Sequence, residues 1–315
     1  MVKEIGGYIE LDTYHLPMLH DGTIALNCGR NALAYLLKAR KIKKLWIPRF
    51  ICDSVTGVCQ REGVPYDLYS VGIDFRPLGE IPLGEGEWLY FVNYYSQFDN
   101  DQISEYVKKY GRVIVDNAQS YFQPPIPHVD TLYTCRKYFG VADGAFLYTD
   151  VSLEENLPQD ESFDRMRFLL GRYERTASEF YNEYSANNKF FITEPIKYMS
   201  KLTDNLLHGI DYAAVEKKRM ENFEFFHRRL GNQNRLNLHK TGTFMYPFMI
   251  SNGAELRKKL LEKKIYIPTL WPDVFEKTKA GDMEYQMAKN ILPLPIDQRY
   301  GYSDLSIILG ELLDA

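Results

Sequence analysis

The sequence predicts an α/β fold, in which helices cover a largely parallel β-sheet, with a smaller α+β part toward the C-terminus. Short apolar runs alternate with amphipathic segments from about residue 24 to residue 150. Strands that alternate with helices of this length are typical of a parallel sheet. After about residue 155 the chain becomes more charged and more helical. With 315 residues, the chain is long enough for two domains.

The first half of the chain supplies the predicted sheet. Segment 31–42 has apolar residues at helical spacing, and its basic residues cluster in the last turns, where they suit the helix dipole. The apolar segment 45–47 is a predicted strand that Pro48 ends. The same patterns predict further helices at 54–61 and 99–110, and strands at 64–71, 88–95, 112–115, 132–134 and 145–148.

The second half is predicted to be mainly helical. Segment 162–183 is charged and helical, with an interruption near 187–195, and segment 198–230 has the pattern of long helical material. A strand at 244–250, a helix at 254–264 and a closing helix at 302–313 complete the chain. We therefore predict an N-terminal extension over 1–23, a large α/β domain over 24–200, and a connecting helix with a small α+β domain over 201–315.

Composition argues against several classes of protein. The 38 basic and 42 acidic residues give a net charge of −4, which does not suit a nucleic-acid binder or a protein held to membranes by basic patches. The N-terminal segment lacks the apolar region of a secretory signal, and the longest apolar runs are far shorter than the roughly 20 residues that span a bilayer. The four cysteines have no metal-binding spacing, so we expect free thiols in a reducing cytoplasm and no bound metal.

Three segments carry candidate chemistry, and the first is RVIVDNAQSYF. Its predicted strand ends at Asp116, and Gln119 follows three residues later. Ligands of α/β proteins bind beyond the carboxyl ends of the strands, where a carboxylate can pair with a cationic ring nitrogen. The alternative is that Asp116 caps the turn or helix that follows it.

The second segment, DTLYTCRKYFGVADGAFLYTD, places Lys137 between two predicted strands and before a glycine-containing turn. Desolvation lowers the pKa of a lysine, and the neutral amine is the form that makes a Schiff base. Thr134, three residues earlier, has a hydroxyl that can bind a phosphate. The alternatives are a solvated surface lysine beside Arg136 and an ordinary strand threonine.

The third segment, IALNCGRNALAYLL, begins with a short apolar run that resembles a strand, and Gly29, Arg30 and a predicted helix follow. Free backbone N–H groups and the helix dipole favour an anion at a helix N-terminus. Arg30 adds a positive charge that can hold a phosphate. Asn and Gly are also common capping residues, so this signal has a purely structural alternative.

Together, in this order and spacing, the three segments resemble the DegT/DnrJ/EryC1/StrS family of pyridoxal-phosphate enzymes. These are sugar aminotransferases of the aspartate-aminotransferase fold (fold type I), a three-layer sandwich with a smaller α+β C-terminal domain. The resemblance implies that Lys137 holds pyridoxal 5′-phosphate covalently, that Asp116 pairs with its pyridine nitrogen, and that Gln119 contacts its ring hydroxyl. It also implies that Gly29 begins the helix that holds the phosphate, with Arg30 where the family usually has a small hydroxyl residue.

Some positions depart from the family pattern. The usual Ser-Phe run before the lysine is replaced here by residues 133–136, which include Thr134, and the N-terminal segment replaces the usual helix and strand. The family has an aromatic residue that stacks on the cofactor ring shortly after the Pro48 position. Cys52 is the nearest match, so we assign this role to Phe50, two residues earlier.

The resemblance implies a transaminase that moves an amino group, with glutamate as the expected donor, to a keto acceptor. The implied acceptor is a nucleotide-linked keto sugar of polysaccharide or glycan biosynthesis, and the implied assembly is a homodimer with the site at the interface. Two alternatives stay open. One is another reaction of the same cofactor, of the lyase or decarboxylase type, and the other is a degenerate, non-catalytic protein on this scaffold. Family members that dehydrate sugars carry a histidine at the position of Lys137.

Overall fold

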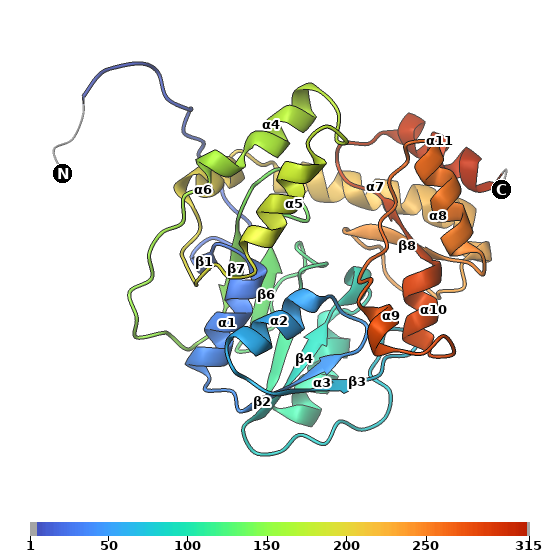
Figure 1. Ribbon diagram of the computed structural model, residues 1–315, viewed down its shortest axis with the longest axis horizontal. Helices are drawn as coiled ribbons and strands as arrows, with labels where there is room; N and C mark the ends of the chain where they lie inside the picture. Colours follow the sequence, from blue (N-terminus) through green and yellow to red (C-terminus); the bar gives the residue numbers. More distant parts are fainter. Residues whose placement is uncertain (1–4, 314–315) are drawn as a thin grey trace.

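The computed structural model describes residues 5–313, and the first half of this part of the chain forms a seven-stranded sheet (Figure 1). The order of its strands is β1-β7-β6-β5-β4-β2-β3. Their bounds are β1 Ile24–Leu26, β2 Lys44–Pro48, β3 Tyr66–Tyr69, β4 Glu87–Val92, β5 Val113–Asp116, β6 Asp130–Thr134 and β7 Ala145–Tyr148.

Most of this sheet is parallel, as predicted. β2 pairs parallel with β3 and β4, β4 with β5, and β5 with β6. β7 runs antiparallel to both of its neighbours, β6 and β1. Therefore β1, β2, β4, β5 and β6 all run in the same direction, and their carboxyl ends meet at one edge of the sheet. We call this edge the carboxyl edge.

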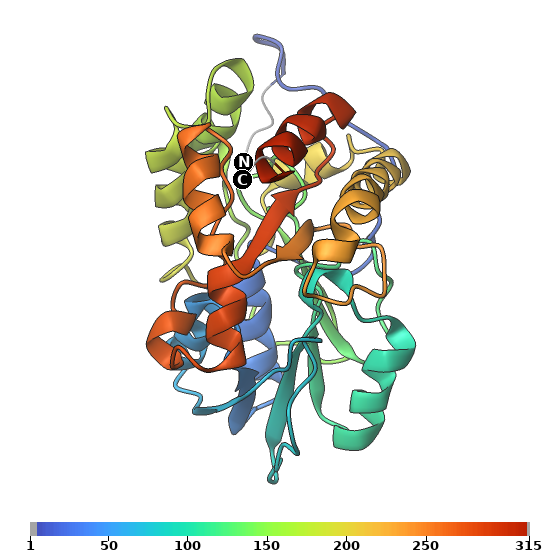
Figure 2. The ribbon, with the colours of Figure 1, turned by 90° about the vertical axis from the view of Figure 1, so that its right-hand side faces the viewer.

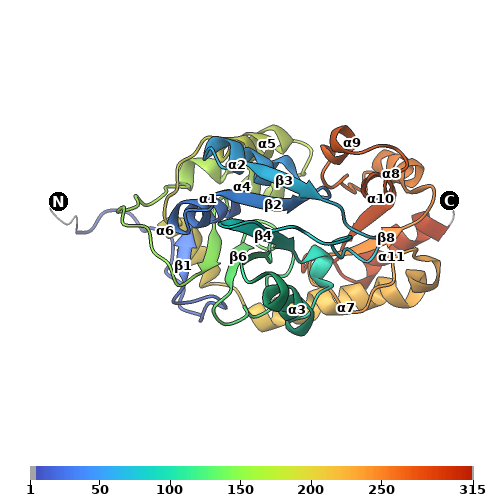
Figure 3. The same ribbon diagram turned by 90° about the horizontal axis from the view of Figure 1, so that it is seen from below.

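Helices cover both faces of the sheet, which gives the three layers of the predicted sandwich. α1 (Gly29–Ala39) and α2 (Asp53–Arg61) lie on one face, and α3 (Asn100–Tyr110) lies on the other (Figure 3). α3 begins with a capping box: Asp99 accepts from the backbone N–H of Gln102, and the Gln102 side chain accepts from the backbone N–H of Asp99.

The helical middle of the chain breaks at places that the sequence did not indicate. It forms α4 (Arg167–Glu174), α5 (Tyr181–Phe190), α6 (Lys201–Leu207) and α7 (Tyr212–Leu230). The segment predicted as one helix over 162–183 breaks between α4 and α5, where Thr176 hydrogen-bonds locally to Glu179. The interruption predicted from residue 187 begins only after α5, because Asn187 donates to the carbonyl oxygen of Ala142 and is held inside the helix.

The C-terminal part has its own small sheet and hydrophobic cluster. β8 (Met245–Met249) pairs antiparallel with β9 (Ile291–Pro295). The surrounding helices are α8 (Gly253–Glu262), α9 (Val274–Lys277), α10 (Met283–Asn290) and α11 (Tyr302–Leu313). Figure 2 shows the small sheet between α7 and α8. The sequence pattern did not indicate α9, α10 or β9. β9 carries two prolines, which lack the N–H of a ladder residue and are tolerated in this two-stranded sheet.

The N-terminal segment runs away from the body of the molecule before β1 (Figure 1). Its described residues form no helix or strand, and backbone hydrogen bonds attach it to α6 and the residue that follows it: Tyr14 N–H donates to Asn205, and Leu16 N–H donates to the His208 carbonyl. His20 then inserts its ring into the body and is 2% exposed. No helix in the described part of the chain is both long and apolar enough to cross a membrane.

Candidate active site

The carboxyl edge brings the three candidate segments together. Asp116 is the last residue of β5, Thr134 is the last residue of β6, and Lys137 lies in the turn that follows β6. Gly29 begins α1 just after β1, and a Cβ atom on Gly29 would lie 3.8 Å from the Cβ of Thr134. Segments more than 80 positions apart in the sequence thus meet at one place in the fold.

Asp116 is buried and held by two donors. The Tyr90 hydroxyl donates to Oδ2 over 2.8 Å, and the backbone N–H of Ala118 donates to Oδ1 over 2.8 Å. The second bond is the local turn contact that the capping alternative anticipates. A carboxylate has about four acceptor positions, so each oxygen can still accept from a further donor. Asp116 therefore shapes its turn and can also bind a protonated ring nitrogen.

Gln119 ties the end of β5 to the end of β4. Its side-chain oxygen accepts from the backbone N–H of Tyr95 over 2.7 Å, and its carbonyl accepts from the Ser96 hydroxyl over 2.6 Å. Tyr95 and Ser96 have φ values of 52° and 62°, in the left-handed region that few side chains adopt. Such strain persists where surrounding contacts hold it, and it is common at functional sites. The Gln119 amide nitrogen makes no hydrogen bond to the described residues and is available to a ligand.

Lys137 is exposed, and its ammonium lies 5.3 Å from the centroid of the Phe244 ring. The sequence is compatible with a buried or an exposed lysine, and in the structure Lys137 is exposed. The Phe244 ring lies 6.2 Å from the ring of Tyr95, whose backbone contacts Gln119. The chain therefore presents an accessible primary amine near the groups that follow β4 and β5.

The turn that carries Lys137 is fixed at both ends. The Gly144 carbonyl accepts from the backbone N–H of Cys135, and Gly144 has a φ of 111°. A Cβ there would also lie 3.1 Å from Cys135 Sγ, so both backbone conformation and space require glycine. Asp143 is fully buried and accepts from the backbone N–H and the hydroxyl of Ser200, each over 2.8 Å. These contacts anchor the turn to the start of α6.

The start of α1 is an electropositive site with free donors. The helix has no side-chain cap, and the backbone N–H groups of Gly29 and Arg30 have no partner among the described residues. Burial raises the pKa of the Cys28 thiol to about 11, and the charges of Arg30, Arg136 and Arg61 act in the opposite direction. The positive charges of three arginines thus act at a helix N-terminus, where an anion is favoured, and one of them, Arg61, is itself paired with Glu62.

Thr134 and Phe50, two of the predicted site residues, differ in how accessible they are to a ligand at the carboxyl edge. The Thr134 side chain is half-buried beside Gly29, and its hydroxyl makes no hydrogen bond to the described residues. Phe50 is 1% exposed, and its ring packs against Trp271 at 4.6 Å and against Tyr94 at 5.5 Å. Because these rings cover Phe50, it offers little surface to a cofactor, and its assignment stays a prediction.

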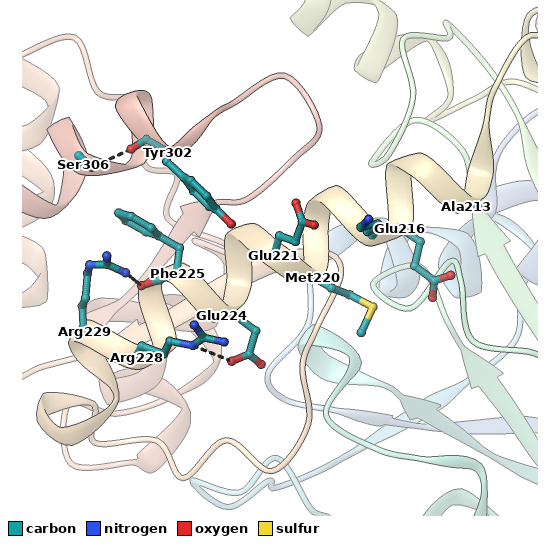
Figure 4. Close-up of a pocket in the computed structure, with 11 residues that line it drawn as sticks. Ala213, Glu216, Met220, Glu221, Glu224, Phe225, Arg228, Arg229, Tyr302 and Ser306 are labelled. Atoms are coloured by element: carbon teal, nitrogen blue, oxygen red, sulfur yellow. Dashed lines mark hydrogen bonds and ion pairs between the residues drawn. The ribbon is translucent and has the colours of Figure 1, made fainter.

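A separate groove lies along the outer surface of α7 and α11, with a volume of about 810 Å³ (Figure 4). Met220, Phe225 and Tyr302 contribute its apolar surface, and Glu224 pairs with Arg228 at its margin. No residue that the sequence predicted for the site lines this groove. Within residues 5–313 there is also no cluster of three or more His, Cys, Asp or Glu side chains that could hold a metal ion.

Sequence reasoning missed two residues that support the site. Tyr90 contacts the Asp116 carboxylate, and Arg219 contacts the turn that carries Lys137. Tyr90 stands two residues before Val92, which pairs with Asp116 across β4 and β5. Because side chains alternate along a strand, Tyr90 faces the same side of the sheet as Asp116. The contact could therefore be predicted from the register of β4 and β5.

No family model matches the sequence, and no curated protein matches it either. Solved structures do. NtdA from Bacillus subtilis with bound PMP is 13% identical, with a TM-score of 0.65 over 93% of this chain and 72% of that one. A DegT DnrJ EryC1 StrS aminotransferase from Brucella abortus is 15% identical, with a TM-score of 0.61 over 93% and 85%. The sugar aminotransferase CalS13 from Micromonospora echinospora is 14% identical, with a TM-score of 0.61 over 93% and 87%.

The chain has the fold of these aminotransferases. The expected aspartate-aminotransferase-like architecture, with a central α/β layer and a smaller C-terminal part, is thereby confirmed. At 13–15% identity the likeness concerns the fold, and activity has to be argued from the residues of the site.

Proposed function

We propose that the chain is a pyridoxal-phosphate-dependent aminotransferase that transfers an amino group to a keto acceptor. One observation supports this proposal most strongly: three kinds of group lie at the same edge of the sheet. They are the exposed Lys137, the buried Asp116 with spare acceptor positions, and the free N–H groups of Gly29 and Arg30. The same edge also carries Gln119 and the other candidate residues.

The available groups match what the cofactor needs. Pyridoxal phosphate requires a primary amine for its aldehyde, a carboxylate for its protonated pyridine nitrogen, and hydrogen-bond donors for its phosphate. Lys137 and Asp116 meet the first two needs. The start of α1, with Arg30 and the free hydroxyl of Thr134, meets the third. The residues therefore fit the cofactor.

In the proposed reaction each residue has a defined role. When bound, pyridoxal phosphate supplies an aldehyde that joins to amines and a ring that draws electrons from the substrate carbon. Lys137 holds the group at rest, and its freed Nζ then takes a proton from the substrate carbon and returns it as general base and acid. Asp116 keeps the proton on the pyridine nitrogen, and the Gln119 amide donates to the ring hydroxyl. Arg30 and Thr134 bind the phosphate.

The proposed acceptor is a nucleotide-linked keto sugar of polysaccharide or glycan biosynthesis, and the proposed donor is glutamate. The family resemblance supports both, as does the shared fold with the sugar aminotransferase CalS13. The guanidinium group of Arg30, which contributes positive charge at the start of α1, suits the anionic groups of such ligands. All four cysteines are free thiols, which suits the proposed location in a reducing cytoplasm.

We also propose a homodimer whose interface includes α4 and α5. These helices and the residues next to them carry several exposed large apolar side chains: Leu170, Tyr173, Tyr181, Tyr184 and Ile192. Exposed apolar side chains that gather on one surface are typical of association surfaces. α5 also contacts the lysine turn, because Asn187 donates to Ala142 and Arg136 donates to Asn188. In sedimentation experiments the wild type should be a dimer, and Tyr173→Arg should yield monomers. A monomeric wild type would contradict this assembly.

The experiment that tests the activity is a half-reaction followed by absorbance. The chain loaded with pyridoxal phosphate is mixed with glutamate, and we expect conversion to the pyridoxamine form with release of 2-oxoglutarate. Lys137→Arg should abolish the conversion, whereas Lys258→Arg, at an exposed position on α8, should not change it. Loss of CO₂ without amino transfer would indicate the decarboxylase alternative. Cofactor binding without conversion by any amino donor would indicate a non-catalytic protein.

A further inference from the structure

Tyr90 and Asp116 lie on neighbouring parallel strands and face the same side of the sheet. In the register of β4 and β5, Val92 pairs with Asp116 and Tyr90 pairs with Ile114. Side chains alternate along a strand, so Tyr90 and Val92 point to one face, and Asp116 shares it. The Tyr90 side chain therefore lies on the same face of the sheet as the Asp116 carboxylate, which stands at the carboxyl edge.

Tyr90 and Asp116 are joined by a buried hydrogen bond in which the Tyr90 hydroxyl is the donor. Tyr90 is 2% exposed, and its hydroxyl lies 2.8 Å from Asp116 Oδ2. Burial, followed by the nearby charge of Asp116, raises the pKa of Tyr90 well above its ordinary value. The hydroxyl thus stays protonated and donates. Tyr90 is itself held in place, because its carbonyl accepts from the Tyr69 hydroxyl over 2.8 Å.

We propose that Tyr90 is a positioning residue that fixes the Asp116 carboxylate for the pyridine nitrogen of the cofactor. This inference rests on the proposed function. The Tyr90 hydroxyl holds Oδ2 and the Ala118 N–H holds Oδ1, so the carboxylate cannot rotate without losing a bond. One acceptor position on each oxygen remains for a ring N–H.

The alternative is that Tyr90 is a core tyrosine whose hydroxyl needs any acceptor. Tyr133 on β6, the strand beside β5, provides the matched control, because its buried hydroxyl donates to the backbone carbonyl of Gln123 over 2.8 Å and not to Asp116. Tyr90→Phe and Tyr133→Phe each remove one oxygen from the same region of the sheet. A purely structural role predicts the same effects from both changes.

The experiment uses the full chain without cofactor, titrated with pyridoxal phosphate labelled with ¹⁵N in the ring. Affinity is read from absorbance, and protonation of the ring from the ¹⁵N chemical shift. For Tyr90→Phe we expect affinity to fall about tenfold and the ¹⁵N shift to move toward that of the unprotonated ring. For Tyr133→Phe we expect an affinity within about twofold of the wild type and an unchanged ¹⁵N shift.

Two results would overturn the inference. In one, Tyr90→Phe keeps the wild-type affinity and ¹⁵N shift while the cofactor still attaches to Lys137. In the other, the two variants change both readouts equally. Fluorinated tyrosines at position 90 keep the hydroxyl and change its acidity, so they test the contact even where Tyr90→Phe does not fold. The ¹⁵N shift should follow their acidity, and a constant shift would contradict the proposal. Failure of the proposed function looks different, because the wild type itself would then bind no cofactor.

Discussion

The carbonyl oxygen of Tyr138, the residue after Lys137, accepts a hydrogen bond of 3.1 Å from the guanidinium of Arg219. Arg219 is 1% exposed and also donates to the Thr243 carbonyl over 2.7 Å and to the Gln298 side chain over 2.8 Å. One buried arginine on α7 therefore connects the lysine turn with two segments of the C-terminal part. The position of Lys137 depends on residues distant from it in sequence.

Arg219→Gln should destabilise the fold by about 3–5 kcal/mol, because it leaves several buried carbonyl acceptors without donors. Urea unfolding without cofactor measures the loss. Arg228→Gln, on the same helix, is the matched control. The Arg228 side chain is 77% exposed, so this change should stay within about 0.5 kcal/mol of the wild type. Equal losses in both variants would show that the buried contacts of Arg219 contribute nothing.

His20 should make stability depend on pH. Burial lowers the pKa of His20 from 6.5 to about 4, against the opposing effect of its bond to the Tyr121 carbonyl. The unfolded chain therefore takes up a proton at a higher pH than the folded chain. Above pH 6.5 the neutral His20 ring makes its full contribution to the free energy of unfolding. This contribution is lost as the pH falls from 6.5 toward 4. The loss for this single site is about 3 kcal/mol.

Urea unfolding at several pH values measures this dependence. Between pH 6.5 and 4, the free energy of unfolding of His20→Gln should fall less steeply with pH than that of the wild type. This holds even if the substitution lowers the stability at neutral pH. His128→Gln is the control, because the His128 side chain is exposed in a turn and should leave the slope as it is. A His20→Gln slope that parallels the wild type would refute the assignment.

Gly242→Ala should disturb the contact between the C-terminal part and the strained turn after β4. A Cβ at position 242 would lie 2.4 Å from the carbonyl oxygen of Tyr95, a backbone atom that cannot move away easily. We expect a loss of about 1–3 kcal/mol in the free energy of unfolding. Gly281→Ala is the control, because nothing lies within 4 Å of its added carbon. A fully stable Gly242→Ala variant would contradict this packing.

Arg30→Gln should weaken cofactor binding through the phosphate. Arg30 forms no hydrogen bond or ion pair with the described residues, so its charge is available at the start of α1. We expect the affinity for pyridoxal phosphate to fall about tenfold at low salt, and less at high salt. Arg228→Gln should leave the affinity unchanged. If both variants bind equally well at every salt concentration, Arg30 does not hold the phosphate.

The sequence allowed the sheet to be predicted, together with the strand ends at which the candidate site residues lie, because both depend on local patterns. Apolar periodicity indicated the strands that end at Asp116 and Thr134, and a parallel sheet brings such ends to one edge. The contacts that complete the site are tertiary. Arg219 and Tyr138 are 81 positions apart, and Tyr90 reaches Asp116 only through strand pairing. The continuation of α5 through Asn187 likewise depends on a distant carbonyl, which overrides the weak helix propensity of asparagine.

The most direct test of the central claim is the site of covalent attachment of the cofactor. The chain is mixed with pyridoxal phosphate, reduced with borohydride, digested and mapped by mass spectrometry. We predict a visible absorbance band that disappears on reduction, and a single stable adduct on the peptide that contains Lys137. An adduct on another lysine, or no adduct at saturating cofactor, would contradict the account.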